Sequence, residues 1–375
     1  MITPDPPFVP GLELAAALYG DAVRPLLESA YPQLGYAAAR IGPGSDVLGF
    51  DTARSADHDW GPRLQLFLTP EDTERHGAAI TALLADRLPR QIRGWSTHFR
   101  HTGDPDNPVS HLEPAAGSTV DHRVTVHQLP GWLTTHLGPG AAGWTDADPT
   151  TADWLALPQQ RLAELTAGTV LRDDHGTLTA VRRRLHWYPE QLWRYLMACQ
   201  WQRIGQEEAF VGRCAETDDD LGAAVVAARL ARDLMRLTLL QHRAYAPYSK
   251  WLGRAFTRLP ADPALGPALR AALAATDHDT RERHLCDAYE SAARTHNALA
   301  LTEPLDPARR SYHSRPYQVL HADRFARALR HTVTDPELRD LPLTGAVDQW
   351  ADSTDLLDRP AAVRAAIDAL ADEAR

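Results

Sequence analysis

The sequence predicts an α+β N-terminal part, with a small mixed sheet and flanking helices, followed by an all-α helical part. Up to about residue 150, short segments with strand patterns alternate with helical patterns. After the glycine- and proline-rich segment 138–151, helical patterns follow one another with short linkers. A chain of 375 residues is long enough for two cores, so we expect one domain at residues 1–150 and a second at residues 151–375.

Two helices and four strands are predicted in the first domain. Helical periodicity extends from Leu12 to Ala30, and the helix predicted at 70–89 has acidic residues in its first turn, where the helix dipole favours them. A long loop is predicted at 103–118, which is rich in proline and glycine. In chain order, the predicted strands are 36–42, 63–69, 91–99 and 120–128.

The second domain is predicted to be helical throughout. Its helical patterns cover residues 153–167, 189–213, 218–242, 278–300 and 317–333. Short linkers such as "TRLPADPALGP" separate them. No internal repeat or low-complexity segment interrupts this order.

Composition and charge restrict the class of protein. The formal charge of −10 argues against binding to extended nucleic acid, which needs a basic surface. No run of about eighteen apolar residues is present, so no membrane-spanning helix is expected. The first residues lack the basic and apolar regions of a secretory signal, and three scattered cysteines are typical of a reducing compartment. These features predict a cytoplasmic protein.

The stretch "GSDVLGFDTARSADHDWGPRLQLFL", residues 44–68, combines a glycine-serine pair with two closely spaced carboxylates. Asp57 and Asp59 would project from the same face of a strand, while His58 and Trp60 would point inward with the apolar residues that follow. Pro62 interrupts the strand locally. Adjacent carboxylates repel each other unless a cation lies between them, and Mg²⁺ suits such oxygen ligands.

This arrangement predicts a site for a nucleoside triphosphate. Gly44 and Ser45, in a turn that enters a helix, would hold the β- and γ-phosphates through backbone N–H groups and the serine hydroxyl. Asp57 and Asp59 would hold Mg²⁺ across the α-phosphate, where an acceptor hydroxyl attacks and pyrophosphate leaves. The alternative is an aspartate-rich turn before a strand, with the Gly-Ser pair in an unrelated bend.

The spacing of these residues resembles the G-S…D-x-D signature of the DNA-polymerase-β-like nucleotidyltransferase superfamily. The resemblance implies that residues 10–140 form the small nucleotidyltransferase-like domain of that superfamily. It also implies a third acidic residue on a neighbouring strand, which binds the catalytic metal and helps to deprotonate the acceptor.

The third carboxylate is the weakest part of this pattern. In the strand predicted at 120–128, the valines share one face, and Asp121, Arg123, Thr125 and His127 share the other. Asp121 is therefore the carboxylate available on the site face, whereas Thr125 stands where the acid is expected. Asp121, a glutamate of the helical domain, or no acid at all are the three alternatives.

Lys250 is the only lysine among the 39 basic residues of the chain. It lies beside Tyr245, Tyr248 and Trp251. An ammonium group suits a triphosphate tail, and an aromatic ring can stack a nucleobase. We expect Lys250 and Tyr248 to contact the nucleotide; the alternative for Lys250 is a solvated surface residue.

From Leu185 to Leu357 the chain resembles the bacterial domain-of-unknown-function family 4037. The resemblance is carried by "YPEQLWRYLMACQW", "QEEAFVGR", "YAPYSKWLGRAF", "THNALALTEPL" and "VDQWADSTDLL". Members combine this helical region with an N-terminal nucleotidyltransferase-like domain, and the family is acidic at the position of Thr125. The resemblance indicates membership and says nothing of the substrate.

Two functions are consistent with these patterns. The first is a Mg²⁺-dependent nucleotidyltransferase that transfers a nucleoside monophosphate, with ATP as the default donor, to a hydroxyl of a small molecule or macromolecule. The second is a nucleotide-binding sensor or interaction protein that lacks the third catalytic carboxylate.

Overall fold

The computed structural model describes residues 6–106, 108–115 and 117–373. The chain divides into two compact units, Met1–Pro149 with Arg161–His186, and Thr150–Gln160 with Trp187–Arg375. The segment 161–186, which the sequence pattern placed in the helical domain, thus belongs to the first compact unit.

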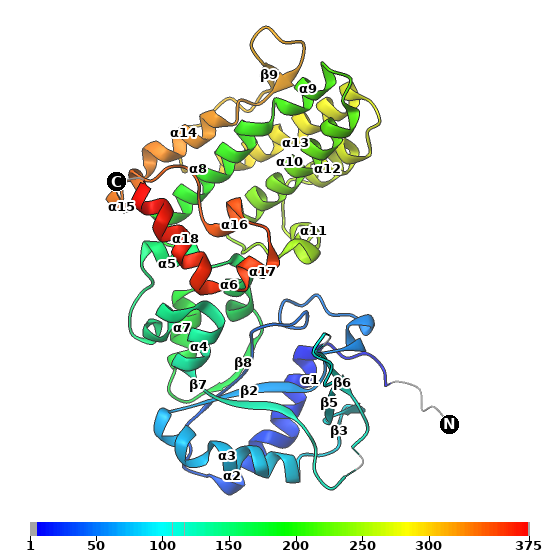
Figure 1. The fold of residues 1–375 in the computed structure, drawn as a ribbon, viewed down its shortest axis with the longest axis vertical. Coiled ribbons are helices and arrows are strands. Elements are labelled where there is room, and N and C mark those ends of the chain that lie inside the picture. The colour runs from blue at the N-terminus through cyan, green and yellow to red at the C-terminus, as the bar shows by residue number, and fades with distance from the viewer. Residues whose placement is uncertain (1–5, 107, 116, 374–375) are drawn as a thin grey trace. The chain divides into compact units, whose positions relative to one another are not determined.

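The first unit combines one mixed sheet with helices and two short hairpins (Figure 1). Its helical elements are α1 (Gly11–Leu18), η1 (Tyr19–Val23), α2 (Arg24–Ala30), η2 (Ala53–Asp57), α3 (Pro70–Arg87), α4 (Leu129–Leu137), η3 (Pro139–Thr145), most of α6 (Gln159–Thr166) and α7 (Thr177–Arg184). Its strands are β1 (Ala37–Arg40), β2 (Arg63–Leu68), β3 (Gln91–Ile92), β4 (Trp95–Ser96), β5 (Phe99–His101), β6 (Ser110–Leu112), β7 (Arg123–Gln128) and β8 (Thr169–Asp173).

The sheet has the strand order β7-β2-β1-β8. Strand β1 is antiparallel to both β2 and β8, and β2 is parallel to β7 with Arg63 opposite Arg123. The predicted small mixed sheet is therefore confirmed. Strand β8 is missing from the prediction, because its sequence "TVLRD" is short and every residue in it is only half-buried.

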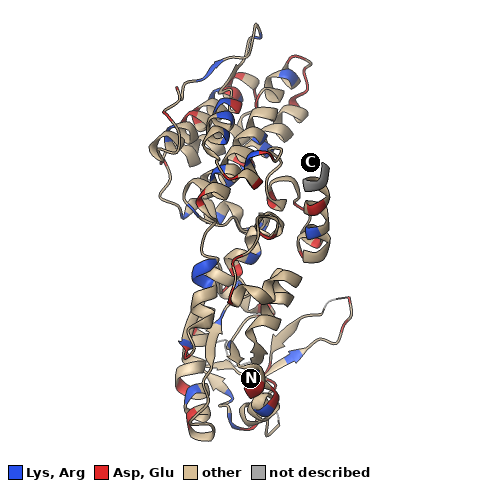
Figure 2. Ribbon diagram, turned by 90° about the vertical axis from the view of Figure 1, so that its left-hand side faces the viewer, with Lys and Arg blue, Asp and Glu red and all other residues tan. Residues whose placement is uncertain are grey.

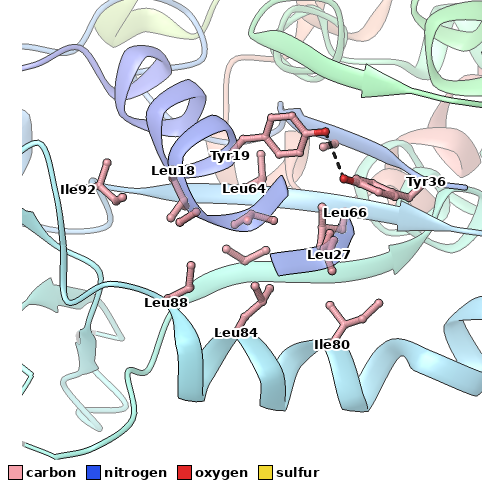
Figure 3. Packing of buried hydrophobic residues seen from close by; sticks show 14 of the residues in the cluster. Leu18, Tyr19, Leu27, Tyr36, Leu64, Leu66, Ile80, Leu84, Leu88 and Ile92 are labelled. Atoms are coloured by element: carbon pink, nitrogen blue, oxygen red, sulfur yellow. Dashed lines mark hydrogen bonds between the residues drawn. The ribbon is translucent and has the colours of Figure 1, made fainter. Parts of the chain in front are cut away.

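One face of the sheet is covered by α1, η1, α2 and α3. Figure 3 shows side chains of these helices meeting Leu64 and Leu66 of β2. The hydroxyl groups of Tyr19 and Tyr36 lie 3.2 Å apart and form a hydrogen bond at the edge of this core. The buried members are Leu18, Tyr19, Ala22, Val23, Leu27, Tyr36, Ala38, Leu64, Leu66, Leu68, Ile80, Leu84, Leu88, Ile92, Val120 and Val124.

Side chains of β2 and β7 alternate between the two faces of the sheet, as expected for strands. Leu64 and Leu66 of β2 and Val124 of β7 enter the core. Arg63 and Arg123 are directly opposite each other and point to the other face of the sheet. The predicted inward orientation of the β7 valines is confirmed, so this strand presents its polar residues to the face that α1–α3 leave uncovered.

Two local predictions in this unit are wrong. The strand predicted at 91–99 is a tight hairpin of β3 and β4, because Arg93 (φ 50°) and Gly94 (φ 86°) form a turn in the left-handed region. The loop predicted at 103–118 contains β6, which pairs with β5. This strand was not predicted because the prolines around it are typical of a loop.

The described part of the second unit is mainly helical and also contains a hairpin of two short strands, each two residues long. Its elements are α5 (Thr151–Ala156), α8 (Glu190–Glu207), α9 (Phe210–Ala215), α10 (Asp220–Gln241), α11 (Ser249–Thr257), α12 (Leu265–Ala274), α13 (His278–Ala298), β9 (Arg310–Ser311), β10 (Gln318–Val319), α14 (Asp323–Thr332), α15 (Pro336–Arg339), α16 (Val347–Trp350), α17 (Thr354–Leu357) and α18 (Pro360–Glu373). The helix predicted at 153–167 is broken after Ala156, and the start of the helix predicted at 317–333 is strand β10.

The predicted order of an α+β part with a small sheet followed by a largely helical part is confirmed. Trp193 and Trp201 of α8 are completely enclosed in the second unit, and Trp201 stacks on Phe325 of α14 with ring centroids 4.7 Å apart. Within the described ranges, no helix is long and apolar enough to cross a membrane. Figure 2 shows acidic and basic residues interspersed along the helices of each unit.

Candidate functional site

Gly44 and Ser45 lie in the turn that follows β1. The turn is closed by hydrogen bonds from the Gly49 N–H to the Asp46 carbonyl (3.0 Å) and from the Phe50 N–H to the Ser45 carbonyl (2.7 Å). Gly49 adopts φ 66°, so the chain turns back and the next helical segment, η2, begins only at Ala53. The prediction that the Gly-Ser pair enters a helix is therefore wrong, and no helix dipole acts on this turn.

The turn is built around a buried ion-pair cluster. Arg40, the last residue of β1, donates from Nε to Asp46 Oδ2 (2.7 Å) and from Nη2 to Asp46 Oδ1 (2.8 Å). Arg40 also donates to the Ile41 and Pro43 carbonyls, and Arg63 Nη2 donates to Asp46 Oδ1 (3.0 Å). Burial opposes ionisation of Asp46, but Arg40 and Arg63 outweigh it, so the pKa of Asp46 lies below its usual value.

Gly44 is in direct contact with this cluster. Its φ is 149°, and a Cβ at this position would lie 2.1 Å from Asp46 Oδ1 and 2.4 Å from Arg40 Nη2. The same Cβ would lie 3.1 Å from Arg63 Nη2. Only glycine therefore allows the turn to approach the guanidinium groups so closely.

Arg63 lies among two further arginines and two carboxylates. Burial and, to a smaller extent, repulsion from Arg40 and Arg123 together lower the pKa of Arg63 to about 10, against the attraction of Asp46 and Asp59. Its Nε is buried and has no hydrogen-bond partner.

Asp57 is the last residue of η2, and its side chain is exposed. Its Oδ1 accepts a hydrogen bond from the His58 backbone N–H (3.1 Å) and lies 3.1 Å from His58 Nδ1. The prediction that Asp57 and Asp59 share the face of a strand is wrong, because β2 begins only at Arg63. His58, predicted to point inward, is exposed.

Asp59 is held by strand β6 and not by a strand of its own. It adopts φ 44°, its N–H donates to the Ser110 carbonyl (2.8 Å), and its Oδ1 accepts from the Ser110 N–H (3.1 Å). Its carboxylate attracts the guanidinium of Arg63. Ser110 Oγ in turn accepts a hydrogen bond from Arg123. Hydrogen bonds thus connect Asp59 to Ser110 and Ser110 to Arg123, and Arg63 lies opposite Arg123 on the neighbouring strand.

Asp121 lies two residues before β7 and is exposed. Its backbone N–H donates to His98 Nδ1 (2.9 Å), and its carbonyl accepts from the Phe99 N–H (2.8 Å). Thr125, in the middle of β7, lies opposite Gln65 and its Oγ1 is 2.8 Å from His127 Nε2. The catalytic role of Asp121 stays a prediction.

The two predicted metal ligands offer the right chemistry for magnesium. Asp57 and Asp59 supply exposed carboxylate oxygens, which suit a Mg²⁺ ion that also takes ligands from substrate phosphates. Among the residues that the structure describes, no three His, Cys, Asp or Glu side chains are grouped to hold a metal ion. A Mg²⁺ ion shared between these two carboxylates and a substrate stays a prediction.

Lys250 and Tyr248 lie in the second unit, at the start of α11. Lys250 is exposed, and its ammonium nitrogen lies 4.8 Å from the centre of the Trp251 ring. The backbone N–H of Tyr248 donates to Gln160 Oε1 (3.0 Å). Their predicted contacts with a nucleotide stay predictions.

Four charged residues near the predicted site were not expected from the sequence. Arg40 and Asp46 flank the Gly-Ser turn, and Arg63 and Arg123 occupy the first positions of two neighbouring strands. A signal was present, because a charged residue at the entry to a buried strand needs a partner. The register that joins Arg63 to Arg123 could not be read from either strand alone.

Comparison with known proteins gives a matching family model and similarity to solved structures. The family model described as "Domain of unknown function (DUF4037)" matches residues 154–252, and no curated protein matches the chain. A nucleotidyltransferase-like protein from Exiguobacterium sibiricum is similar at 13% identity and a TM-score of 0.30, over 85% of this chain and 90% of that chain. The predicted resemblance to domain-of-unknown-function family 4037 is thus confirmed over residues 154–252, and it stays a prediction for residues 253–357.

Proposed function

We propose that the first unit binds a nucleoside triphosphate with Mg²⁺ and transfers its nucleoside monophosphate to a hydroxyl acceptor. The observation that carries this proposal is the convergence of Gly44 and Asp59 on Arg63. Gly44 and Asp59, which are fifteen residues apart in the sequence, are thereby brought to one guanidinium.

The residues around Arg63 match the charges of such a substrate. Arg63 and Arg123 would contact phosphate oxygens beside the Gly44–Ser45 turn, whose backbone N–H groups supply further donors. Asp57 and Asp59 would hold Mg²⁺, which neutralises developing charge on the phosphates when it is bound. Asp121 is our candidate to accept the proton of the attacking hydroxyl, as the P–O bond to pyrophosphate breaks.

A second function is favoured by Thr125. Its position in the middle of β7 has a hydroxyl instead of a carboxylate, and Asp121 lies outside the strand. A chain with two metal-binding carboxylates and no positioned base would bind a nucleotide without transferring it. The alternative is therefore a nucleotide sensor that uses the same Arg63 site.

Nucleotide binding and transfer can be tested separately on the full-length chain. Thermal unfolding with ATP, GTP, CTP or UTP, with and without Mg²⁺, measures binding; a ligand at a hundred times its Kd stabilises by about 2.7 kcal/mol. Transfer is measured with α-phosphate-labelled ATP and a panel of hydroxyl compounds, nucleic acids and proteins. Lys250→Met in the same binding assay tests the predicted role of the lone lysine.

Asp59→Asn is the decisive variant. Asparagine keeps the oxygen that accepts from the Ser110 N–H and tolerates a left-handed φ, but it loses the charge that holds Mg²⁺. We expect label transfer to fall by at least about a hundredfold, the range for losing one electrostatic catalytic group. Glu74→Gln, an exposed carboxylate on α3, is the matched control. Mg²⁺-dependent binding without transfer supports the sensor, and no Mg²⁺-dependent binding of any nucleotide contradicts both functions.

A further inference from the structure

A cavity in the second unit is lined by none of the residues assigned to the nucleotide site. Its volume is about 580 Å³, and its walls come from α5, α15, α18 and the segment 340–345. Small-molecule sites commonly have volumes of about 300–1,000 Å³. The cavity is therefore large enough for an organic molecule and too small for a folded partner.

The interior of the cavity is mostly apolar and its floor is fixed. It is lined by Leu155 of α5, by Leu341 in the segment 340–345 and by Ile367 of α18. Tyr195 of α8 also lines it, but its hydroxyl donates to the Pro342 carbonyl (2.7 Å) and accepts from the Gly345 N–H (3.3 Å). Tyr195 therefore closes the floor with satisfied hydrogen bonds and contributes its ring as an apolar surface.

The charged residues that line the cavity differ in whether they already have an ion-pair partner. Arg364 forms ion pairs with Asp153 and Asp368, and Asp340 forms an ion pair with Arg339. Glu337 of α15 is exposed, and its Oε2 accepts a hydrogen bond of 2.7 Å from the Thr151 hydroxyl, a neutral donor. The carboxylate of Glu337 thus lines the cavity, and its contact with a neutral hydroxyl leaves its charge uncompensated.

From this arrangement we infer that the cavity binds a small organic cation. An apolar body packs against Leu155, Leu341 and Ile367, and an ammonium group pairs with the Glu337 carboxylate. The cavity lies wholly in the second unit, so the inference is independent of the function proposed for Arg63.

The test uses matched probes on the full-length chain. Tryptamine carries an ammonium group, and indole-3-propionate carries a carboxylate on the same ring and a chain of similar length. Titration calorimetry is expected to give saturable binding of tryptamine with a Kd on the order of 1 mM or lower, the value typical of a ligand this small. Indole-3-propionate is expected to bind at least about tenfold more weakly because Glu337 repels it.

Two variants make the inference falsifiable. Glu337→Gln keeps an oxygen for the Thr151 hydroxyl and is expected to weaken tryptamine binding about three- to fivefold, as for an exposed ion pair. Ala152→Trp fills the cavity from a half-buried position and should abolish binding of both probes, while circular dichroism confirms the fold. Glu303→Gln, an exposed carboxylate of the same unit, is the control.

The outcomes are distinct. Equal binding of the two probes, or unchanged tryptamine binding to Glu337→Gln, overturns the cationic specificity. Unchanged binding to Ala152→Trp moves the site elsewhere and overturns the inference, as does the lack of saturable tryptamine binding. Loss of nucleotide binding in Asp59→Asn with tryptamine binding intact separates this site from the first one.

Discussion

At the residue scale, Asp46 links the stability of the first unit to its candidate site. Its carboxylate is completely buried and forms ion pairs with both Arg40 and Arg63. Asp46→Ala would leave two guanidinium groups facing each other without an anion. We expect a loss of about 3–5 kcal/mol in the free energy of unfolding, the cost of removing one partner from a buried ion pair. Urea denaturation followed by tryptophan fluorescence measures it.

The matched exposed pair on α3 provides the control. Glu71 and Arg75 are both solvent-exposed and lie one helical turn apart. Glu71→Gln should therefore change the free energy of unfolding by only about 0.3–0.5 kcal/mol. A similar small loss in Asp46→Ala would show that the buried cluster does not stabilise the fold.

Two glycines should respond in opposite ways to the same substitution. Gly44→Ala places a methyl group 2.1 Å from Asp46 Oδ1, at a φ that alanine rarely adopts, so we expect destabilisation of more than about 1 kcal/mol and weaker nucleotide binding. Gly131 in α4 has nothing within 4 Å of the added methyl group, so Gly131→Ala should stabilise by about 0.5–1 kcal/mol. Thermal unfolding of both variants tests the pair, and equal responses would contradict it.

At the element scale, Glu208 joins the end of α8 to the connection between β10 and α14. Its two carboxylate oxygens accept hydrogen bonds of 2.8 Å from the Leu320 and Ala322 backbone N–H groups. Burial nevertheless dominates and raises the pKa of Glu208 to about 7. The folded protein therefore holds this proton more tightly than the unfolded chain does.

This raised pKa predicts a loss of stability as pH rises. The contribution of Glu208 is fully present below its unfolded pKa, near 4.5, and is lost as pH rises through about 7. The loss is on the order of 3 kcal/mol, at about 1.4 kcal/mol for each unit of pKa. Urea unfolding of the natural chain and of Glu208→Gln between pH 4.5 and 8 measures it. A slope that persists unchanged in Glu208→Gln would assign the pH dependence to other groups.

Elements that bury one clear face could be predicted from the sequence. Strands β2 and β7 and helices α10 and α13 follow simple periodicity, because their core faces are continuous. Strand β8 could not be predicted in this way, because sheet pairing to β1 and not its own pattern holds it in place. The position of Asp59 was missed for the same reason, since a hydrogen bond to Ser110, 51 residues away, fixes it.

At the scale of the whole molecule, the compact units do not follow the order of the chain. The segment after residue 160 returns to the first unit, where β8 adds the last strand beside β1. The Gly168 N–H also donates to the Val47 carbonyl, and the Gly42 N–H to the Glu164 carbonyl. The turn that carries Gly44 is therefore supported from both sides by residues that a boundary at 150 would remove.

This interweaving predicts different behaviour for two N-terminal fragments. A fragment of residues 1–149 lacks β8. Strand β1 keeps its pairing with β2 but becomes the edge of the sheet, and the turn loses its hydrogen bonds to residues 164 and 168. Exposed edges promote association between chains. We expect this fragment to aggregate or to unfold without a cooperative transition, whereas residues 1–186 should give a cooperative one in urea. Sedimentation velocity and circular dichroism compare them at equal concentration. If the shorter fragment is monomeric and unfolds at the same urea concentration, β8 contributes little, and the first unit is complete without residues 161–186.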